Sequence, residues 1–219
     1  MKTLELFSGT KSFSKVAKQG YGFETLTVDN DPALNPDICI DIMDFNVDLL
    51  EDYKPDIIWG SPPCTQFSVA SMGKNWKYAY REDKKLNPED YLPANEKTKQ
   101  AIEIIKKTMQ IINELNPKYF YIENPRSVLR KLDLIPYPFA TVTYCQYGFK
   151  NMKPTDIWSN NRKWQMVAKS CKNGMDCHES APRGSKTGTQ GIKGAKARGM
   201  IPPKLIEEIL DYSIDINNG

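Results

Sequence analysis

The sequence predicts an α/β protein built on a largely parallel sheet. Strand-like apolar runs alternate with amphipathic helical segments through the first half of the chain, and polar residues follow most of these runs. The chain has 219 residues, of which 40% are hydrophobic and 26% are charged, as in one folded domain. A disordered chain is therefore excluded.

The expected strands are short apolar runs that end in turn residues. The first ends at Ser8-Gly9, the second at Asp29-Asn30, and the third stops at Gly60 before two prolines. We expect strands at residues 3–7, 24–28, 56–59 and 118–122, with weaker patterns at 141–144 and 156–158.

Three segments have helical periodicity. Residues 12–19 follow the first strand, and residues 99–115 repeat apolar side chains on one face. A closing helix is expected after Pro202-Pro203, because proline suits the first turn of a helix. Residues 71–98 and 170–200 show no periodicity and are expected to be irregular.

Two features argue against a membrane-spanning protein and against a secreted protein. No apolar stretch approaches the ~20 residues that a membrane span needs. Glu5 places a carboxylate where a signal peptide needs an apolar core. The odd number of cysteines argues against a disulfide framework, so we expect a cytoplasmic protein in a reducing environment. At least one of the five thiols is then expected to be free; the cysteines are Cys39, Cys64, Cys145, Cys171 and Cys177.

Positive charge is concentrated in one segment. Residues 160–199 hold nine basic and two acidic residues, whereas the remainder of the chain has more acidic than basic residues. Such a segment is either a solvated loop or a contact for a polyanion such as nucleic acid.

Cys64 has the most informative surroundings. It follows a strand and the stiff pair Pro62-Pro63, so it lies on a constrained loop at a strand end. A nucleophilic thiol needs such a fixed position, together with a lowered pKa or a nearby base. The alternatives are a small buried apolar residue, or a cysteine protease pair with His178, for which no local signature is present.

Other polar residues also follow strands. Ser8-Gly9, Asp29 and Glu123 fall at the carboxyl ends, where parallel sheets bind ligands. Asp29 suits either the hydroxyls of a ribose or the cap of a turn. The glycine pattern of a dinucleotide site is incomplete, which disfavours a nicotinamide oxidoreductase.

Together these segments resemble the DNA cytosine-5 methyltransferase family, over residues 1–158 and about 200–212. The resemblance implies an α/β, Rossmann-like S-adenosylmethionine-dependent methyltransferase fold. Its mostly parallel sheet would be flanked by helices, with the closing helix packed beside the first. The matching segments are Leu6-Phe7-Ser8-Gly9, Val28-Asp29, Asp41-Ile42, residues 60–64 continuing to 70, Glu123-Asn124 and residues 201–205.

The same resemblance implies the reaction and the partners. The family transfers a methyl group from S-adenosylmethionine to C5 of a cytosine that has left the DNA duplex. Cys64 would bond to C6 of the base, and Glu123 would hold or protonate N3. DNA is the implied partner, and we expect a monomer. The implied cofactor-binding residues are Phe7, Ser8, Gly9, Thr10, Asp29, Asn30, Asp41, Ile42, Ser61 and Pro62.

The chain departs from the family pattern within its motifs. Thr65 stands where the family has glutamine, and Pro125 where it has valine. Lys153 and Thr155 occupy the two arginine positions of a Gln-x-Arg-x-Arg motif. We expect both to belong to the catalytic site, although lysine does not replace a bidentate arginine.

The region available for target recognition is short. The catalytic domain is expected to comprise residues 1–158 and 200–219, which leaves 159–199 as a small irregular basic insert. Such an insert suits phosphate contacts more than base reading, so we expect short or relaxed sequence specificity. Residues 71–98 occupy the position of the family's mobile catalytic loop. The expected nucleic-acid contacts are Trp76, Lys77, Tyr78 and Arg81 in that loop, and Arg162, Lys163, Arg183 and Lys186 in the insert.

A zinc site is a further expectation at Cys171, Cys177 and His178, which lie close in the sequence. Their spacing is not a standard one, and a fourth ligand is needed. Cys145 would supply it only if the fold brings it near. Otherwise these residues are two free thiols and a solvent-facing imidazole.

Two other functions remain open. RNA or a free nucleotide would suit the short recognition region. A nucleic-acid-binding member with impaired catalysis would explain the altered arginine motif, whereas the intact Cys64 and Glu123 favour an enzyme. Restriction-modification, self-protection of a mobile element or virus, and regulation are all compatible roles.

Overall fold

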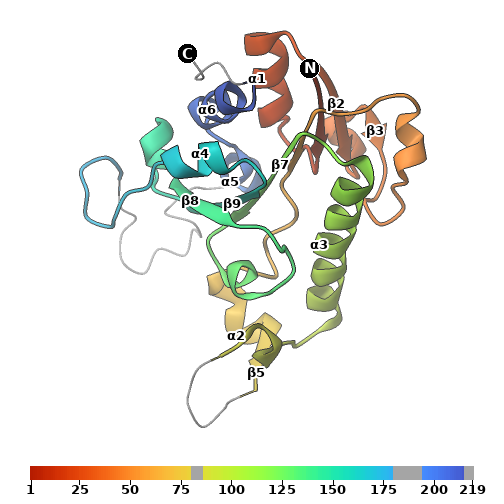
Figure 1. Cartoon of the computed structure of the whole chain (residues 1–219). Helices are drawn as coiled ribbons and strands as arrows, with labels where there is room; N and C mark the ends of the chain where they lie inside the picture. Colours follow the sequence, from red (N-terminus) through yellow and green to blue (C-terminus); the bar gives the residue numbers. More distant parts are fainter. Residues whose placement is uncertain (80–85, 180–193, 215–219) are drawn as a thin grey trace.

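A seven-stranded sheet forms the centre of the molecule (Figure 1). The computed structural model describes residues 1–79, 86–179 and 194–214. The sheet contains β1 (Lys2–Leu6), β2 (Glu24–Asp29), β3 (Ile38–Cys39), β4 (Ile57–Gly60), β7 (Tyr119–Pro125), β8 (Phe139–Thr143) and β9 (Pro154–Ser159). A separate pair contains β5 (Trp76–Tyr78) and β6 (Tyr91–Pro93). The helices are α1 (Ser12–Tyr21), α2 (Met72–Asn75), α3 (Glu96–Leu115), α4 (Arg162–Val167), α5 (Ala195–Gly199) and α6 (Pro203–Ser213).

The strand order is β3-β2-β1-β4-β7-β9-β8. The first five strands are parallel, and β9 runs antiparallel to β7 and to β8. The expected Rossmann-like architecture with a mostly parallel sheet is therefore confirmed. The chain moves outward from β1 to β3 and then returns to β4, so the strand order switches between β1 and β4. Ligands of open α/β sheets bind outside the carboxyl ends of strands at such a switch.

Helix α3 covers one face of the sheet (Figure 1). It begins three residues before the expected start, because Asn95 caps it: the Oδ1 of Asn95 accepts a hydrogen bond from the Thr98 amide at 3.0 Å. Ile105, Met109 and Ile112 are buried in the core on this face, as their spacing predicts.

Helices α1 and α6 lie side by side on the other face (Figure 1). Pro203 begins α6, which buries Leu205 and Ile209 in the same core as Phe13 of α1. The hydroxyl of Tyr21 joins the two helices by donating to Asp211 at 2.6 Å. The expected packing of the closing helix beside the first one is confirmed.

Two segments have more secondary structure or tighter packing than the sequence predicts. The stretch 71–98, expected to be irregular, contains α2 and the β5–β6 pair. The boundary expected after residue 158 falls inside β9. Beyond it, the fully buried Trp164 packs edge-to-face on Tyr121 with 5.7 Å between ring centroids. The start of the basic insert is thus part of the main core.

The short strand β3 was not expected, because two residues are too few for a detectable pattern.

Within the described parts of the chain, no helix has the length and apolar character needed to cross a membrane. The proposed nucleic-acid contacts Arg81, Arg183 and Lys186 lie outside the described residues.

Candidate active site

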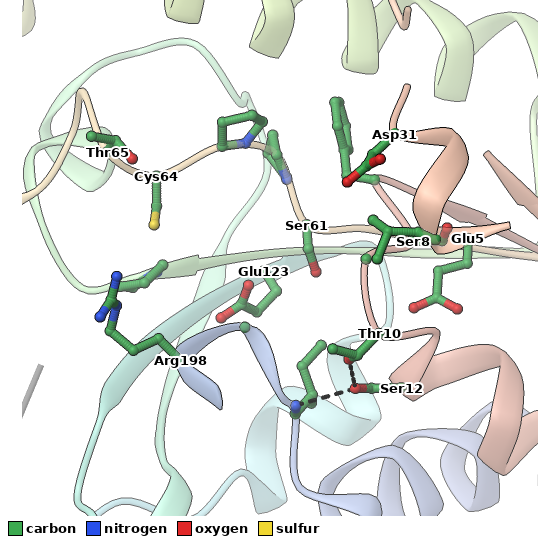
Figure 2. A pocket seen from close by; sticks show the side chains of 18 of the residues that line it. Glu5, Ser8, Thr10, Ser12, Asp31, Ser61, Cys64, Thr65, Glu123 and Arg198 are labelled. Carbon is green, nitrogen blue, oxygen red and sulfur yellow. Dashed lines mark hydrogen bonds between the residues drawn. The ribbon is translucent and has the colours of Figure 1, made fainter. Parts of the chain in front are cut away.

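A cavity of about 480 Å³ opens where β1, β4 and β7 end (Figure 2). Its position is the one that the strand order predicts for a ligand site. Residues distant in the sequence meet there. Those with chemistry-bearing side chains include Glu5, Ser8, Cys64, Glu123, Lys153 and Arg198.

The turn between β1 and α1 forms one wall of the cavity. Phe7 and Gly9 have positive φ angles of 57° and 46°, which fold the backbone tightly into the helix. The Gly9 amide donates to Oδ2 of Asp29 at 2.8 Å, and the Asp31 amide donates to Oδ1 at 3.0 Å. Asp29 therefore organises this turn, in addition to its expected place at a ligand site.

Glu5 is a site residue that the sequence reasoning did not single out. Its buried carboxylate accepts hydrogen bonds from the amides of Ser14, at 2.8 Å, and Phe13, at 3.3 Å, in the first turn of α1. Burial raises the pKa of Glu5 to about 7, although the hydrogen bonds from Ser14 and Phe13 oppose this shift. A charged residue within an apolar strand was the available signal.

A second hollow of about 80 Å³ adjoins the first, because Phe7 and Pro63 line both. Phe7, Ser8, Gly9, Thr10, Ser61 and Pro62 line the main cavity. Asp29, Asn30, Asp41 and Ile42 line the smaller hollow. The structure thus places all ten of the residues predicted to bind the cofactor on two adjoining hollows.

Cys64 lies on the loop after β4, with its sulfur directed toward Glu123 and Arg198 (Figure 2). The side chain is half-buried. Asn124 fixes this loop, because its Nδ2 donates to the carbonyl of Pro62 at 3.1 Å. The two residues of the Glu-Asn pair therefore have different tasks: Glu123 faces the cavity, and Asn124 holds the loop that carries the thiol.

Glu123 is held between two side chains. Its Oε1 accepts a hydrogen bond from the hydroxyl of Tyr144 at 2.9 Å and lies 3.6 Å from Nζ of Lys153. Burial, and then the charge of Glu123, raise the pKa of Tyr144 well above its ordinary value, so Tyr144 remains a hydrogen-bond donor.

Of the two residues at the altered arginine motif, only Lys153 lines the cavity. Lys153 is buried, and its Nζ donates to the carbonyl of Arg198 at 2.8 Å and lies 4.4 Å from the ring centroid of Tyr144. Thr155 is fully buried behind it, and its hydroxyl donates to the carbonyl of Lys153 at 3.1 Å. Thr155 therefore supports the turn that carries Lys153.

The charges around Cys64 oppose each other. Burial raises the pKa of the Cys64 thiol, and the negative charge of Glu123 raises it further. Lys153 and Arg198 lower the pKa but do not overcome the first two effects. The free protein therefore favours the thiol form of Cys64 over the thiolate.

Arg198 was also missed as an individual site residue. It lies in α5, within a segment that the sequence identified as basic but irregular. Lysine and arginine recur throughout that segment, so the sequence offers no signal for this particular residue. Its place beside Cys64 is visible only in the folded chain (Figure 2).

The proposed nucleic-acid contacts are widely separated. Trp76 is only 2% exposed, and its Nε1 donates to the carbonyl of Gln66 at 2.8 Å, so its ring belongs to the core and cannot stack on a base. Lys77 is exposed, whereas Tyr78 is half-buried and packs edge-to-face on Tyr91.

Arg162 and Lys163 are exposed, but they follow the far end of β9. Ser159 pairs with Tyr121 near the start of β7, whereas Thr155 pairs with Pro125 at its end. Arg162 and Lys163 therefore lie toward the end of the strands that is opposite the cavity.

The three zinc candidates Cys171, Cys177 and His178 do come together, and Cys145 joins them. The ligand atoms of the four residues all lie within 4.8 Å of one another. None of the four lines the cavity around Cys64.

Comparison with known proteins agrees with this geometry. The model of the C-5 cytosine-specific DNA methylase family matches residues 1–134. A relative from Frog virus 3 (isolate Goorha), named as a probable DNA (cytosine-5)-methyltransferase, is 31% identical over an alignment that covers 96% of this chain and 99% of the relative. The resemblance expected from the motifs is confirmed.

Two solved structures share the fold. One is described as a DNA modification methyltransferase encoded within an Escherichia coli prophage, with 17% identity and a TM-score of 0.50, and the other is the methyltransferase EhMeth of Entamoeba histolytica, with 12% and 0.50. Each match covers 73% of this chain, but only 46% and 52% of the solved chains, so this chain spans about half of their length. The family match and the viral relative show that the chain belongs to the C-5 cytosine-specific DNA methylases, the enzymes that methylate C5 of cytosine in DNA.

Proposed function

We propose that this chain transfers the methyl group of S-adenosylmethionine to C5 of a flipped DNA cytosine, through a covalent bond between Cys64 and C6. One observation carries the proposal. Cys64, Glu123 and Lys153 converge in one cavity that adjoins the turn organised by Asp29. Family membership supports the reaction class, and the cavity supports the assignment of these residues.

The residues present fit the cofactor. Ser8 lines the cavity, and its buried hydroxyl has no hydrogen-bond partner among the described residues, which suits a polar ligand. Asp29 would hold the ribose hydroxyls, since a carboxylate accepts more hydrogen bonds than the two it already receives. Asp41 and Ile42 would flank the adenine in the smaller hollow. When bound, this cofactor supplies a methyl group on a positively charged sulfur.

Cys64 and Glu123 would activate the base together. Cys64 gives its thiol proton to solvent water, the resulting thiolate adds to C6, and the electron pair of the C5–C6 double bond moves into the ring. Glu123 in its protonated form gives or shares a proton at N3, which neutralises that charge. C5 then takes up the methyl group. Removal of the C5 proton restores the double bond and expels Cys64.

The opposing charges around Cys64 determine the order of these reaction steps. While Glu123 is a carboxylate, its charge helps to keep Cys64 in the thiol form. Once Glu123 carries the proton destined for N3, that opposition ends, whereas Lys153 and Arg198 still favour the thiolate. The thiol would thus become reactive when the cytosine arrives, because the cytosine and Glu123 share a proton.

Basic residues of the insert would bind the backbone of the target strand. The insert is short and rich in lysine and arginine, which favours phosphate contacts over base reading. We therefore propose a short or relaxed target sequence. Sequencing of methylated cytosines in treated plasmid DNA would contradict this if one motif of about six or more bases emerged.

The direct test is a covalent complex with duplex DNA that contains 5-fluorocytosine. Fluorine cannot leave as a proton does, so the methylated base stays bonded to Cys64. We expect a stable complex with the native chain and with the matched control Cys39→Ser, whose thiol is exposed on β3, and none with Cys64→Ser. Parallel assays of methyl transfer to duplex DNA, RNA and deoxycytidine monophosphate identify the substrate. Transfer to RNA or the nucleotide alone would overturn the proposal.

A further inference from the structure

We propose that Cys145, Cys171, Cys177 and His178 form a structural zinc site that attaches the basic insert to the catalytic domain. Three of these residues are close in the sequence, and the fold brings Cys145 to them from another element. A closed set of four sulfur and nitrogen ligands is the usual composition of a structural zinc site.

The distances between the ligand atoms suit one tetrahedral ion. With zinc–sulfur bonds near 2.3 Å and zinc–nitrogen bonds near 2.0 Å, tetrahedral ligands lie about 3.8 Å apart between sulfurs and about 3.5 Å between sulfur and nitrogen. The Sγ atoms of Cys145 and Cys177 are 3.8 Å apart. Nδ1 of His178 lies 3.6 Å from Sγ of Cys171 and 3.5 Å from Sγ of Cys177.

One edge of the tetrahedron is short. The Sγ atoms of Cys145 and Cys171 are 3.2 Å apart, so a bound ion would separate them by roughly half an ångström. This distance is nevertheless far longer than the ~2.05 Å of a disulfide bond. Three thiols and an imidazole also exclude magnesium and calcium as the preferred ions, since those bind oxygen.

Neighbouring groups orient the ligands. Gln146 donates from Nε2 to Sγ of Cys177 at 3.2 Å. The amide of Cys171 donates to Oγ1 of Thr143 at 2.9 Å. The turn beyond the site is closed by the Glu179 amide, which donates to the carbonyl of Lys150 at 2.8 Å. Supporting contacts of this kind fix ligand geometry in metal sites.

The surrounding segment has little else to hold it. Cys177 is exposed and Met175 is 54% exposed, so burial of apolar side chains contributes little between residues 170 and 179. Metal binding supplies folding free energy in such small segments.

The proposed zinc site is connected to the cavity around Cys64 through Cys145. Cys145 follows Tyr144, whose hydroxyl donates to Glu123, and both lie in the short 3₁₀ helix Tyr144–Tyr147. An ion bound to Cys145 would therefore connect the insert to the element that orients Glu123.

Metal analysis of the purified chain, prepared under reducing conditions, tests this inference. We expect about one zinc per chain in the native protein and in Cys39→Ser. Cys171→Ser and Cys177→Ser should bind zinc at least about tenfold more weakly. Replacement by Co²⁺ should give the visible absorption of a tetrahedral thiolate complex. Zinc added to chelator-treated native chain should protect residues 168–179 from proteolysis.

Three results would overturn the inference. The first is a reduced native chain that takes up no zinc when titrated with the metal alone. The second is equal loss of zinc from Cys39→Ser and Cys171→Ser. The third is a mass two hydrogens lower, with a peptide linking Cys145 to Cys171, which would identify a disulfide. The chelation experiment uses native chain, so a variant that fails to fold does not remove the test.

Discussion

Cys64 and the cluster of Cys145, Cys171 and Cys177 place the same side chain in opposite surroundings. Cys64 is a single sulfur between a carboxylate and two cationic side chains, at the end of a buried strand. The cluster sulfurs face one another and an imidazole, and those of Cys171 and Cys177 lie in a polar segment with little buried apolar surface. The comparison teaches that neighbouring side chains decide whether a cysteine suits nucleophilic or metal chemistry.

The two regions also differ in what holds them in place. The Cys64 loop continues from the central strand β4 and is fixed by Asn124 of β7. Its geometry therefore persists as long as the sheet is folded. The segment of Cys171 and Cys177 is held by contacts within the cluster and by a few hydrogen bonds, with little apolar burial, so we expect it to open locally more readily than the sheet.

The largest expected effect follows removal of the catalytic sulfur. Cys64→Ser should lower methyl transfer by about 10⁴-fold or more, because a hydroxyl is a much weaker nucleophile than a thiolate. Incorporation of labelled methyl into duplex DNA measures the effect, with Cys39→Ser as the control. Substantial activity in Cys64→Ser would break the comparison, because Cys64 would then not be the nucleophile.

Glu123→Gln should separate catalysis from thiol reactivity. We expect about 10²- to 10³-fold slower methyl transfer, because glutamine cannot protonate N3. Loss of the carboxylate charge should also lower the pKa of Cys64, since Glu123 is one of the groups that raise it. Alkylation of Cys64 by iodoacetamide, followed against pH, should then begin at lower pH than in the native chain. An unchanged alkylation profile would contradict the charge coupling.

Glu5, in strand β1, makes the stability of the folded chain depend on pH. Its pKa is about 7 in the folded chain against an ordinary value of 4.5, so the folded state binds the proton more tightly than the unfolded state. Stability from this residue is fully present below about pH 4.5 and is lost as the pH rises through about 7, by about 3 kcal/mol in all. Glu5→Gln should therefore flatten the fall in Tm between about pH 5 and pH 8. An equally steep fall in the variant would assign the pH dependence to other groups.

Lys153→Met should act in the direction opposite to Glu123→Gln. Removing the ammonium group raises the pKa of Cys64, so alkylation should begin at higher pH. Methyl transfer should fall by about tenfold or more, because Lys153 also contacts the carboxylate of Glu123. Lys153→Arg should restore part of the activity if positive charge is the property required. A shift of the alkylation profile to lower pH would disprove this role.

The smallest effect on Cys64 is expected from the cluster. Cys177→Ser should weaken zinc binding and expose its segment to proteolysis, yet shift the alkylation profile of Cys64 far less than Lys153→Met does. Cys177 does not touch Glu123: among the described residues, the two are linked through Cys145 and its neighbour Tyr144. Equal shifts in the two variants would show that the regions act as one unit.

The predictable parts of the molecule are those with local signals. The strands β1, β4 and β7 follow from short apolar runs, and the cofactor-side residues follow motifs at their ends. Trp76 was misassigned to nucleic-acid binding, because an aromatic residue among lysines has the same pattern whether its ring faces inward or outward. In the fold, the ring is buried beneath the Cys64 loop.

Other site residues could not be found from local pattern. Arg198 and Cys145 have functional neighbours only because distant segments meet, and no spacing rule connects them to their partners. Thr155 occupies an arginine position of the family motif, but its side chain lies behind Lys153. Charge counting identified residues 160–199 as basic but gave no information on which of them reach the cavity.

The packing of α6 beside α1 has a consequence for biosynthesis. The cavity is lined by Glu5 near the start of the chain and by Arg198 and Ile201 near its end, and the Ile201 amide donates to Ser12 at 3.4 Å (Figure 2). A ribosome releases Glu5 long before Arg198 and Ile201. The nascent chain can begin to form its sheet early, but it cannot complete the cavity until Ile201 has emerged, which delays catalytic competence until that point of synthesis.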